Sequence, residues 1–263
     1  MTPYKILFLD IDGTLLRPDH TMEQSTKKAI FQVQEQGIET VLATGRPIHE
    51  ITELGAELKI ESFIGYNGAL ALYKGEKVFA EPMDVKSVEY FLKVAATNKH
   101  DIVLYSSTTN FFTSLDSPKV KAFIDTFDLR KNEVYTDDNV GDILGMTIIT
   151  DSETGNDRYS LEDGIHFSQV HVNGMRHCFD VIRDKVNKGV GIQFLLDRLG
   201  IPKSSAIAFG DGMNDKEMLS TVGEGFAMGN AHENLFQYAK HKTTSVTDSG
   251  VYNGLKSLGL VEE

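Results

Sequence analysis

The first third of the chain alternates between short apolar runs and amphipathic stretches. Apolar runs at 5–9, 38–43 and 62–65 each stop abruptly at polar and glycine residues. Such runs are typical of strands buried on both faces of a parallel sheet. Apolar residues recur at helical spacing between the runs, so we expect a helix from a Thr21 cap through Gln36 and another starting at Pro47. This alternation predicts a doubly wound parallel sheet.

The pattern changes in the middle of the chain and then resumes. From about Met83 to Val186 the segments are amphipathic, which suits a sheet with one covered face. We therefore expect a core formed by residues 1–82 and 187–263, with a separate α+β domain inserted at 83–186. The expected later elements are strands at 70–73, 77–79, 102–105, 110–113, 145–150, 165–172, 177–182, 205–209 and 225–228, and helices at 85–97, 119–128, 190–199, 233–239 and 250–258.

Acidic side chains follow two of the predicted core strands. Asp10 and Asp12 follow the first strand, and Asp211 and Asp215 lie in the turn after the strand at 205–209. Parallel strands bring such ends to one edge of the sheet, where ligands bind. Four carboxylates repel one another unless a cation shares them, and oxygen ligands without His or Cys favour Mg²⁺. A calcium-binding EF-hand loop starting at Asp10 would need Glu at its twelfth position, which is Thr21 here.

Two further features predict an anion site beside these acids. The strand at 38–43 ends in Thr44-Gly45-Arg46, and its hydroxyl and the backbone N–H groups at an expected helix start would bind an anion. Lys188, in a loop before a helix, supplies a compact positive charge. An acid cluster, an anion site and a lysine together suggest phosphoryl transfer. Asp10 would then be the nucleophile, and Asp12 the general acid and base.

Composition narrows the partners of this chain. The formal net charge of the 263 residues is -12, which disfavours nucleic acid because phosphate backbones attract Lys and Arg. No apolar run approaches the length of a membrane span, and no signal-peptide pattern opens the chain. The single cysteine, Cys178, excludes an internal disulfide and fits a reducing, cytoplasmic setting. The oligomeric state cannot be predicted from the sequence.

The motifs together resemble a known family. Asp10-Ile11-Asp12-Gly13-Thr14, Thr44-Gly45-Arg46, Lys188 and Gly210–Asp215 are similar to the four motifs of the haloacid dehalogenase-like superfamily. The strings at 66–69, 227–231 and 249–251 resemble its Cof-type hydrolase branch. The resemblance implies a Rossmann-like core with an inserted α/β cap domain, and a Mg²⁺-dependent phosphatase of small phosphorylated metabolites.

The resemblance also implies a role for each matching residue. Asp10 would attack phosphorus, and Asp12 would protonate the leaving oxygen and then activate water. Asp215 would orient Lys188 or a metal-bound water. The implied metal ligands are Asp10, Asp12 (through its carbonyl), Asp211 and Asp215; the implied phosphate-binding residues are Ile11, Thr44, Gly45, Lys188 and Asn214; Arg46 and Asn67 would lie on the substrate side.

Other interpretations remain open from the sequence. Thr44 and Asp215 are also suited to capping helices, Arg46 to a surface ion pair, and Lys188 to a solvated surface position. The nearest rival functions are a phosphomutase and a non-catalytic sensor of sugar phosphates. A dehalogenase of the superfamily lacks the second aspartate, so Asp12 argues against that reaction. Sugar phosphates, pyridoxal phosphate and flavin mononucleotide all remain candidate substrates.

Overall fold

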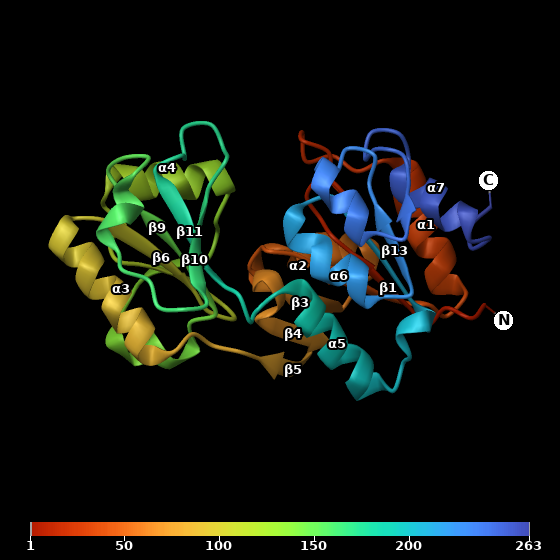
Figure 1. Cartoon of the computed structure of the whole chain (residues 1–263), viewed down its shortest axis with the longest axis horizontal. Coiled ribbons are helices and arrows are strands. Elements are labelled where there is room, and N and C mark those ends of the chain that lie inside the picture. The colour runs from red at the N-terminus through yellow and green to blue at the C-terminus, as the bar shows by residue number, and fades with distance from the viewer. Residues whose placement is uncertain (1, 263) are drawn as a thin grey trace. The chain divides into compact units, whose positions relative to one another are not determined.

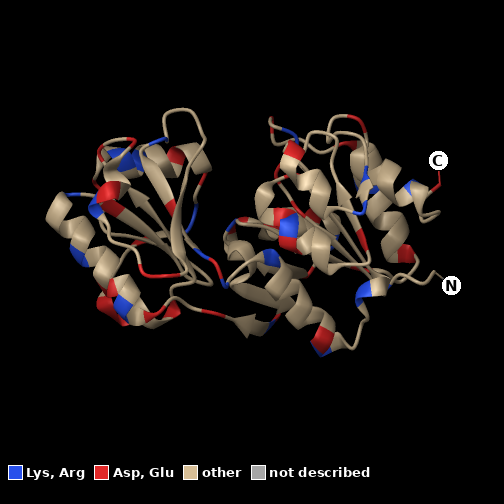
Figure 2. Cartoon of the chain, in the orientation of Figure 1, with Lys and Arg blue, Asp and Glu red and all other residues tan. Residues whose placement is uncertain are grey.

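The computed structural model describes residues 2–262 (Figure 1). The described chain divides into two compact units. The core unit comprises residues 2–46, 52–79 and 187–262, and the insert unit comprises residues 47–51 and 80–186. Figure 2 shows Lys and Arg scattered among Asp and Glu in both units. Among the described helices, none is long and apolar enough to cross a membrane.

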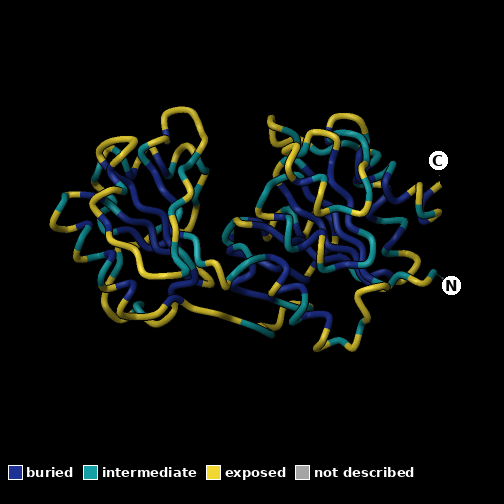
Figure 3. The backbone as a smooth tube through the Cα atoms, in the orientation of Figure 1, coloured by how far each residue is buried: buried dark blue, intermediate teal, exposed yellow. Residues whose placement is uncertain are grey.

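The core unit is built on an eight-stranded sheet in the order β14-β13-β12-β1-β2-β3-β4-β5. The pairings from β14 through β3 are parallel, and β4 runs antiparallel to β3. All four residues of β1 are completely buried, as expected for a central strand covered on both faces (Figure 3). The strands are β1 Ile6–Leu9, β2 Glu39–Ala43, β3 Ser62–Gly65, β4 Leu70–Tyr73, β5 Glu76–Ala80, β12 Ala206–Gly210, β13 Glu224–Ala227 and β14 His241–Lys242.

Helices cover both faces of this sheet. Helices α1 (Gln24–Glu35), α2 (Thr52–Leu58) and α7 (Gly250–Ser257) lie on one face (Figure 1). Helices α5 (Lys188–Leu199) and α6 (Lys216–Thr221) pack together on the other, over a cluster that includes Phe8, Val41 and Ile64. The expected doubly wound parallel sheet is therefore confirmed.

The insert unit is a second, six-stranded sheet in the order β10-β11-β9-β6-β7-β8. Helix α3 (Val85–Asn98) packs on the face that carries Ile102, Leu104 and Ile148, and α4 (Pro118–Phe127) packs on the opposite face. Only β7 and β8 pair in parallel. The strands are β6 Asp101–Tyr105, β7 Asn110–Phe112, β8 Asn132–Val134, β9 Gly145–Ile149, β10 Ile165–Gln169 and β11 Cys178–Arg183.

Two expected helix starts are wrong. Helix α1 begins at Gln24 rather than after a Thr21 cap, because Leu16 forms isolated β-bridges with Asp12 and Met22 and the Thr21 hydroxyl donates to Asp19. The helix expected from Pro47 is interrupted: Ile48–Glu50 is a short 3-10 turn, and α2 begins at Thr52. The segment expected to be helical at 233–239 is also a 3-10 segment, Glu233–Tyr238.

The interruption after Pro47 has a tertiary cause. His49 is 8% exposed, and its Nε2 lies 3.0 Å from Asn110 Oδ1. Asn110 Nδ2 donates to Glu50 Oε1 at 2.6 Å, and the backbone N–H of Arg130 donates to the same oxygen at 3.1 Å. These contacts explain why residues 47–51 belong to the insert unit although they follow a core strand. A regular helix over Pro47–Leu58 would place these side chains differently.

Candidate active site

The ends of β1 and β12 bring Asp10 and Asp211 together. The two strands pair in parallel with Leu9 opposite Phe209, and the N–H of Asp10 donates to the carbonyl of Phe209 at 3.1 Å. Asp10 and Asp211 directly follow these neighbouring strands. Asp10 is only 6% exposed, so its carboxyl group lies largely out of water.

Lys188 is buried between two carboxylates. It is the first residue of α5 and is 0% exposed. Its Nζ donates to Asp10 Oδ1 at 2.5 Å and to Asp215 Oδ1 at 2.6 Å. Burial alone would lower the pKa of Lys188, but Asp10 and Asp215 raise it above its ordinary value, so the ammonium group stays charged. The alternative of a solvated surface lysine is therefore wrong.

The turn at 66–68 gives α5 room to place Lys188. Tyr66 and Asn67 have φ angles of 53° and 52°, and Gly68 has a φ of 103°. A Cβ at Gly68 would lie 2.1 Å from the carbonyl oxygen of Asn187, so only glycine permits this close approach. Asn187 caps α5, since its side-chain oxygen accepts from the N–H of Val190 at 3.1 Å. These contacts fix the first turn of the helix that carries Lys188.

Asp215 organises the turn after β12. It is 0% exposed, and its Oδ2 accepts from the backbone N–H groups of Asp211 at 2.9 Å and Gly212 at 3.0 Å. Its other oxygen accepts from Lys188. Asp215 thus holds both the loop that carries Asp211 and the lysine. Of the two implied roles for Asp215, these contacts correspond to orientation of Lys188.

Three carboxylates form a group suited to a cation. Asp10, Asp211 and Asp215 each offer an oxygen, and these oxygens lie within 4.8 Å of one another. Burial, and next the Asp215 charge, raise the pKa of Asp211 to about 6; the same two causes, opposed by Lys188, raise the pKa of Asp10 well above its ordinary value. Holding these carboxylates ionised, close together and out of water costs free energy, and a hard divalent cation would offset that cost. An all-oxygen donor set fits Mg²⁺. The residues present therefore fit the expected metal.

Asp12 lies apart from this group and pairs with Arg46. Its side chain is 54% exposed, whereas that of Asp10 is 9% exposed. Arg46 Nε donates to Asp12 Oδ2 at 2.7 Å, and Nη2 donates to Oδ1 at 2.5 Å, which is a bidentate contact. Arg46 therefore forms the surface ion pair that the sequence left open as one interpretation, and its partner is Asp12. This contact restricts how the Asp12 carboxylate is oriented.

The polar residues after β2 and β3 form hydrogen bonds within their own loop and with the loop after β12. Thr44 is 1% exposed, and its hydroxyl accepts from the N–H of Arg46 at 3.1 Å. A Cβ at Gly45 would come within 3.1 Å of Asn67 Oδ1, and that oxygen accepts from Asn214 Nδ2 at 3.0 Å. Thr44 caps no helix, because α2 begins only at Thr52. The expected N–H groups at a helix start are thus corrected to loop N–H groups.

Sequence reasoning missed two neighbours of Asp211. Thr14 Oγ1 donates to Asp211 Oδ1 at 3.2 Å. Asn230 Nδ2 donates to the carbonyl of Gly13 at 2.8 Å and lies 3.4 Å from Asp211 Oδ2. Gly13 has a φ of 81°, and a Cβ there would lie 2.2 Å from Asp211 Oδ2. The signal that could have found Asn230 was its place in a polar turn directly after the strand at 225–228.

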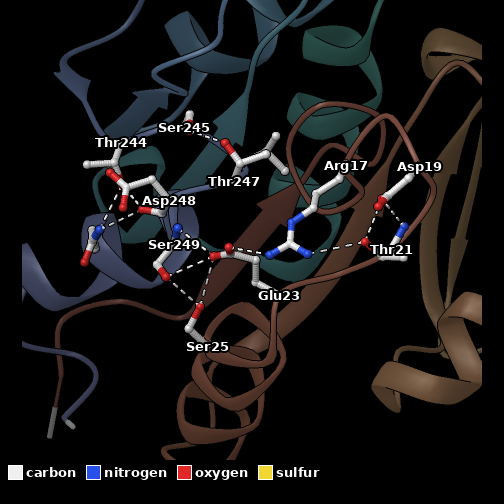
Figure 4. Close-up of polar contacts among 12 residues, drawn as sticks. Arg17, Asp19, Thr21, Glu23, Ser25, Thr244, Ser245, Thr247, Asp248 and Ser249 are labelled. Carbon is white, nitrogen blue, oxygen red and sulfur yellow. Dashed lines mark hydrogen bonds and ion pairs between the residues drawn. The ribbon is translucent and has the colours of Figure 1, made fainter.

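A polar network anchors the segment that follows Asp12. Glu23 accepts from Arg17 Nη2 at 2.5 Å, and from the N–H and hydroxyl of Ser249 at 2.7 and 2.9 Å (Figure 4). Partial burial works to raise the pKa of Glu23, but the contacts with Arg17 and Ser249 hold it below its ordinary value. Figure 4 also shows Ser25 joined to Ser249, through hydroxyls 2.8 Å apart. Residues 17–25 are thereby tied to the start of α7.

The arrangement of these motifs matches known proteins. A family model described as haloacid dehalogenase-like hydrolase matches residues 7–255. The chain belongs to this family of hydrolases. It is 30% identical to a putative phosphatase, YkrA, of Bacillus subtilis, over 98% of this chain and 99% of the relative. It is 28% identical to the Bacillus subtilis 5-amino-6-(5-phospho-D-ribitylamino)uracil phosphatase YitU, with 97% of each chain covered.

Solved structures show the same fold. A hypothetical protein from Geobacillus kaustophilus HTA426 superposes with a TM-score of 0.89 at 30% identity, covering 98% of this chain and 100% of the other. The resemblance inferred from the motifs is confirmed: the chain is a haloacid dehalogenase-like hydrolase, and several of its relatives are named phosphatases.

Proposed function

We propose that this hydrolase is a Mg²⁺-dependent phosphatase of small phosphorylated metabolites that works through an aspartyl-phosphate on Asp10. The observation that carries the proposal is the buried contact of Lys188 with Asp10 and Asp215 beside Asp211. A lysine held among carboxylates that also suit a cation would offset the negative charge of a phosphoryl group. Relatives named for different phosphorylated substrates support the substrate class, among them YitU and an HMP-PP phosphatase of Cronobacter sakazakii.

The proposed reaction has two steps. An Asp10 carboxylate oxygen forms a bond to phosphorus while the bond from phosphorus to the substrate oxygen breaks, and Asp12 gives that oxygen a proton. Asp12 then takes a proton from water, whose oxygen attacks phosphorus and releases phosphate from Asp10. In the structure both oxygens of Asp12 accept from Arg46, so this contact would have to open before Asp12 carries the proton that it gives to the leaving oxygen.

The remaining residues would bind the phosphoryl group and the metal. Bound Mg²⁺ supplies positive charge that offsets the negative charge of the phosphoryl oxygens. Its ligands would be the carboxylates of Asp10 and Asp211, the carbonyl of Asp12 and, directly or through water, Asp215. Lys188, Thr44, Gly45, Asn214 and the backbone of Ile11 would hold the phosphoryl group, and Asn67, which accepts from Asn214, would lie on the substrate side.

We also propose a division of labour along the chain. Residues 1–82 and 187–263 would form the catalytic core, and 83–186 a cap that selects substrates and excludes water. The compact units differ from this division mainly at 47–51, which pack within the insert unit. Since that segment adjoins Arg46 in the chain, the cap would be connected directly to the residue that pairs with Asp12.

The test is phosphate release from a panel of sugar phosphates, pyridoxal phosphate, flavin mononucleotide and other phosphate monoesters. We expect release with Mg²⁺ and a loss of at least about 100-fold with a chelator, because the metal offsets charge in the transition state. Release unaffected by chelation would contradict the metal requirement. Isomerised phosphorylated product without free phosphate would indicate the rival phosphomutase, and binding without turnover would indicate a sensor.

Mg²⁺ is expected to stabilise the protein more at pH 7.5 than at pH 5. Without metal, burial raises the pKa of Asp211 to about 6 and that of Asp10 well above its ordinary value. Below pH 6 protons therefore compete with the cation, and as the pH rises the ionised carboxylates repel one another until a cation binds. A cation at about 100 times its Kd contributes about 2.7 kcal/mol, which corresponds to a Tm increase of about 5–10 °C.

Thermal unfolding with and without Mg²⁺ at the two pH values measures this difference. Asp211→Asn is the control and should remove most of the Mg²⁺ effect at pH 7.5. Equal stabilisation at both pH values would show that these carboxylates do not hold the ion.

A further inference from the structure

Asn230 joins three separate segments of the core unit. It lies in the turn after β13, and its Nδ2 donates to the carbonyl oxygen of Gly13 at 2.8 Å, in the turn after β1. The same Nδ2 lies 3.4 Å from Oδ2 of Asp211, in the turn after β12. Its Oδ1 accepts from the backbone N–H of Val246 at 2.8 Å. One exposed asparagine therefore uses both ends of its amide to connect the turns after β1 and β12 with the loop before α7.

The backbone partners fix which end of this amide faces Asp211. A carbonyl oxygen such as that of Gly13 only accepts hydrogen bonds, and a backbone N–H such as that of Val246 only donates them. With its amide turned over, Asn230 would set oxygen against oxygen at Gly13 and nitrogen against nitrogen at Val246. The N–H₂ end must therefore point to Gly13 and Asp211, so a neutral donor faces this carboxylate.

Asp211 differs from the other two carboxylates of its group in the donors that it receives. Those two both accept from the charged Nζ of Lys188. Within the described chain, the side-chain donors to Asp211 are neutral: the Thr14 hydroxyl, 3.2 Å from Oδ1, and the Asn230 amide. An ionised carboxylate has about four acceptor sites, so two neutral donors orient it without filling it. The Asp211 charge thus remains available to a cation, and its direction depends on these two donors.

The turn after β1 packs directly against Asp211. A Cβ at Gly13 would lie 2.2 Å from Asp211 Oδ2, so only a bare backbone fits here. The N–H of Gly13 donates to the carbonyl of Leu16 at 2.9 Å, and the carbonyl of Gly13 is held by Asn230. Asp12, whose carbonyl is an implied metal ligand, is joined to Gly13 by a peptide bond. A shift of the Gly13 carbonyl would therefore disturb two metal ligands at once.

Backbone contacts, rather than burial, give the Asn230 amide a fixed direction. Val246 is 6% exposed, and the backbone N–H of the residue before Asn230 donates to the carbonyl of Thr244 at 2.9 Å. The far end of the same loop is held by Ser249, whose N–H and hydroxyl both donate to Glu23 (Figure 4). The loop before α7 is thus a firm support for an exposed side chain.

We propose that Asn230 is a positioning residue of the metal site: its N–H₂ group holds the Asp211 carboxylate and the Gly13 turn in the arrangement that binds Mg²⁺. This inference rests on the proposed function, which supplies the metal. Side chains that hydrogen-bond to metal ligands fix the direction of those ligands, and their loss typically weakens metal binding about 10- to 100-fold. Asn230 acts through Asp211 and Gly13, and it has no contact with the substrate.

The test is calorimetric titration of the metal-free protein with MgCl₂ at pH 7.5, without substrate. In Asn230→Ala we expect the Kd for Mg²⁺ to rise about 10-fold, at the lower end of the usual range because the contact with Asp211 is long. The matched control is Asn234→Ala. Asn234 is exposed and bonds to His232 and Gln237 through its backbone, so the Kd should change less than about twofold.

Glu23→Ala distinguishes a loosened loop from a misdirected ligand. It removes the contacts that hold Ser249, but Glu23 bonds to neither Asp211 nor Gly13. We expect this variant to lower the Tm of the metal-free protein, whereas its Kd for Mg²⁺ should rise less than about threefold. An equal rise of the Kd in Glu23→Ala and Asn230→Ala would show that the stability of the loop governs metal binding, and would overturn the inference.

Phosphate release gives a second readout. At limiting Mg²⁺, Asn230→Ala should be slower by about the factor by which its Kd rises, and excess Mg²⁺ should restore kcat to within about threefold with KM unchanged. A raised KM at saturating Mg²⁺ would place Asn230 at the substrate and contradict a positioning role. An unchanged Kd for Mg²⁺ would also contradict it.

The outcomes separate this inference from the proposed function. If the unaltered protein binds Mg²⁺ but releases no phosphate, the proposed function fails, and the comparison of Kd values still decides the role of Asn230. If the unaltered protein releases phosphate with Mg²⁺ and Asn230→Ala binds the ion equally well, only the inference is wrong. If the unaltered protein binds no Mg²⁺, both are wrong.

Discussion

Replacing Asp10 with asparagine is expected to lower phosphate release by about 10⁴-fold or more, because an amide cannot act as the nucleophile that a carboxylate provides. The fold should survive the change. Asparagine has nearly the same shape, and Lys188 keeps its contact with Asp215. The change also removes the buried negative charge of Asp10, whose burial raises the pKa of that carboxyl group. The free energy of unfolding should therefore change by only about 1 kcal/mol.

Initial rates with saturating Mg²⁺, together with thermal unfolding, measure both parts of this prediction. Asp163→Asn is a suitable control, because Asp163 is an exposed aspartate of the insert unit and should leave rate and Tm unchanged. A variant that retains a tenth or more of the original rate would exclude Asp10 as the nucleophile. A large loss of stability would show instead that the Asp10 charge is needed for folding.

Lys188→Met is expected to produce the largest combined loss of stability and activity. Methionine fills similar volume, but its substitution leaves Asp10 and Asp215 buried without their shared cation. Removing one partner from a buried ion pair typically costs about 3–5 kcal/mol. Phosphate release should fall by at least about 10³-fold, since the charge that would offset the phosphoryl oxygens is lost.

The stability loss in Lys188→Met should depend on pH. The pKa of Asp10 is already raised by burial and by Asp215, and it rises further when Lys188 is removed. A raised carboxyl pKa destabilises the folded state at high pH, and this penalty disappears as the pH falls through the folded pKa and the group is protonated. Denaturant unfolding should therefore show a larger deficit at pH 8 than at pH 5.

The exposed Lys185→Met is the matched control and should be nearly neutral at both pH values. A deficit in Lys188→Met that is independent of pH would point to lost packing rather than to uncompensated charge. A small deficit, under about 1 kcal/mol, would show that the three-residue contact contributes little to folding.

The regular elements of the core were predictable because their signal is local. The run at 62–65 became β3 with the same bounds, and the run at 5–9 became β1, Ile6–Leu9. A strand with apolar side chains on both sides is stable only where both faces of its sheet are covered. The two strands that were missed, β8 and β14, have three and two residues, which is too short for a period-2 pattern to be seen.

The errors occurred where distant residues determine the local structure. Pro47 and the apolar residues after it suit one helix, yet Asn110, 60 residues from Glu50, holds Glu50 in a 3-10 turn. Local helix propensity contributes less free energy than the hydrogen bonds of buried polar side chains, so the tertiary contacts determine the local structure here. The same is true of Asn230, whose link to Asp211 bridges two separate strand ends.

The sequence by itself determined the family, the doubly wound core and the identity of the chemical groups, because these depend on residue types and their order. Only the tertiary structure decided which groups meet: Lys188 is enclosed by Asp10 and Asp215, Arg46 is paired with Asp12, and Asn230 joins Gly13 to Val246. The physical reason is that burial and charge pairing depend on distances between segments far apart in the chain, and no local pattern of residues encodes those distances.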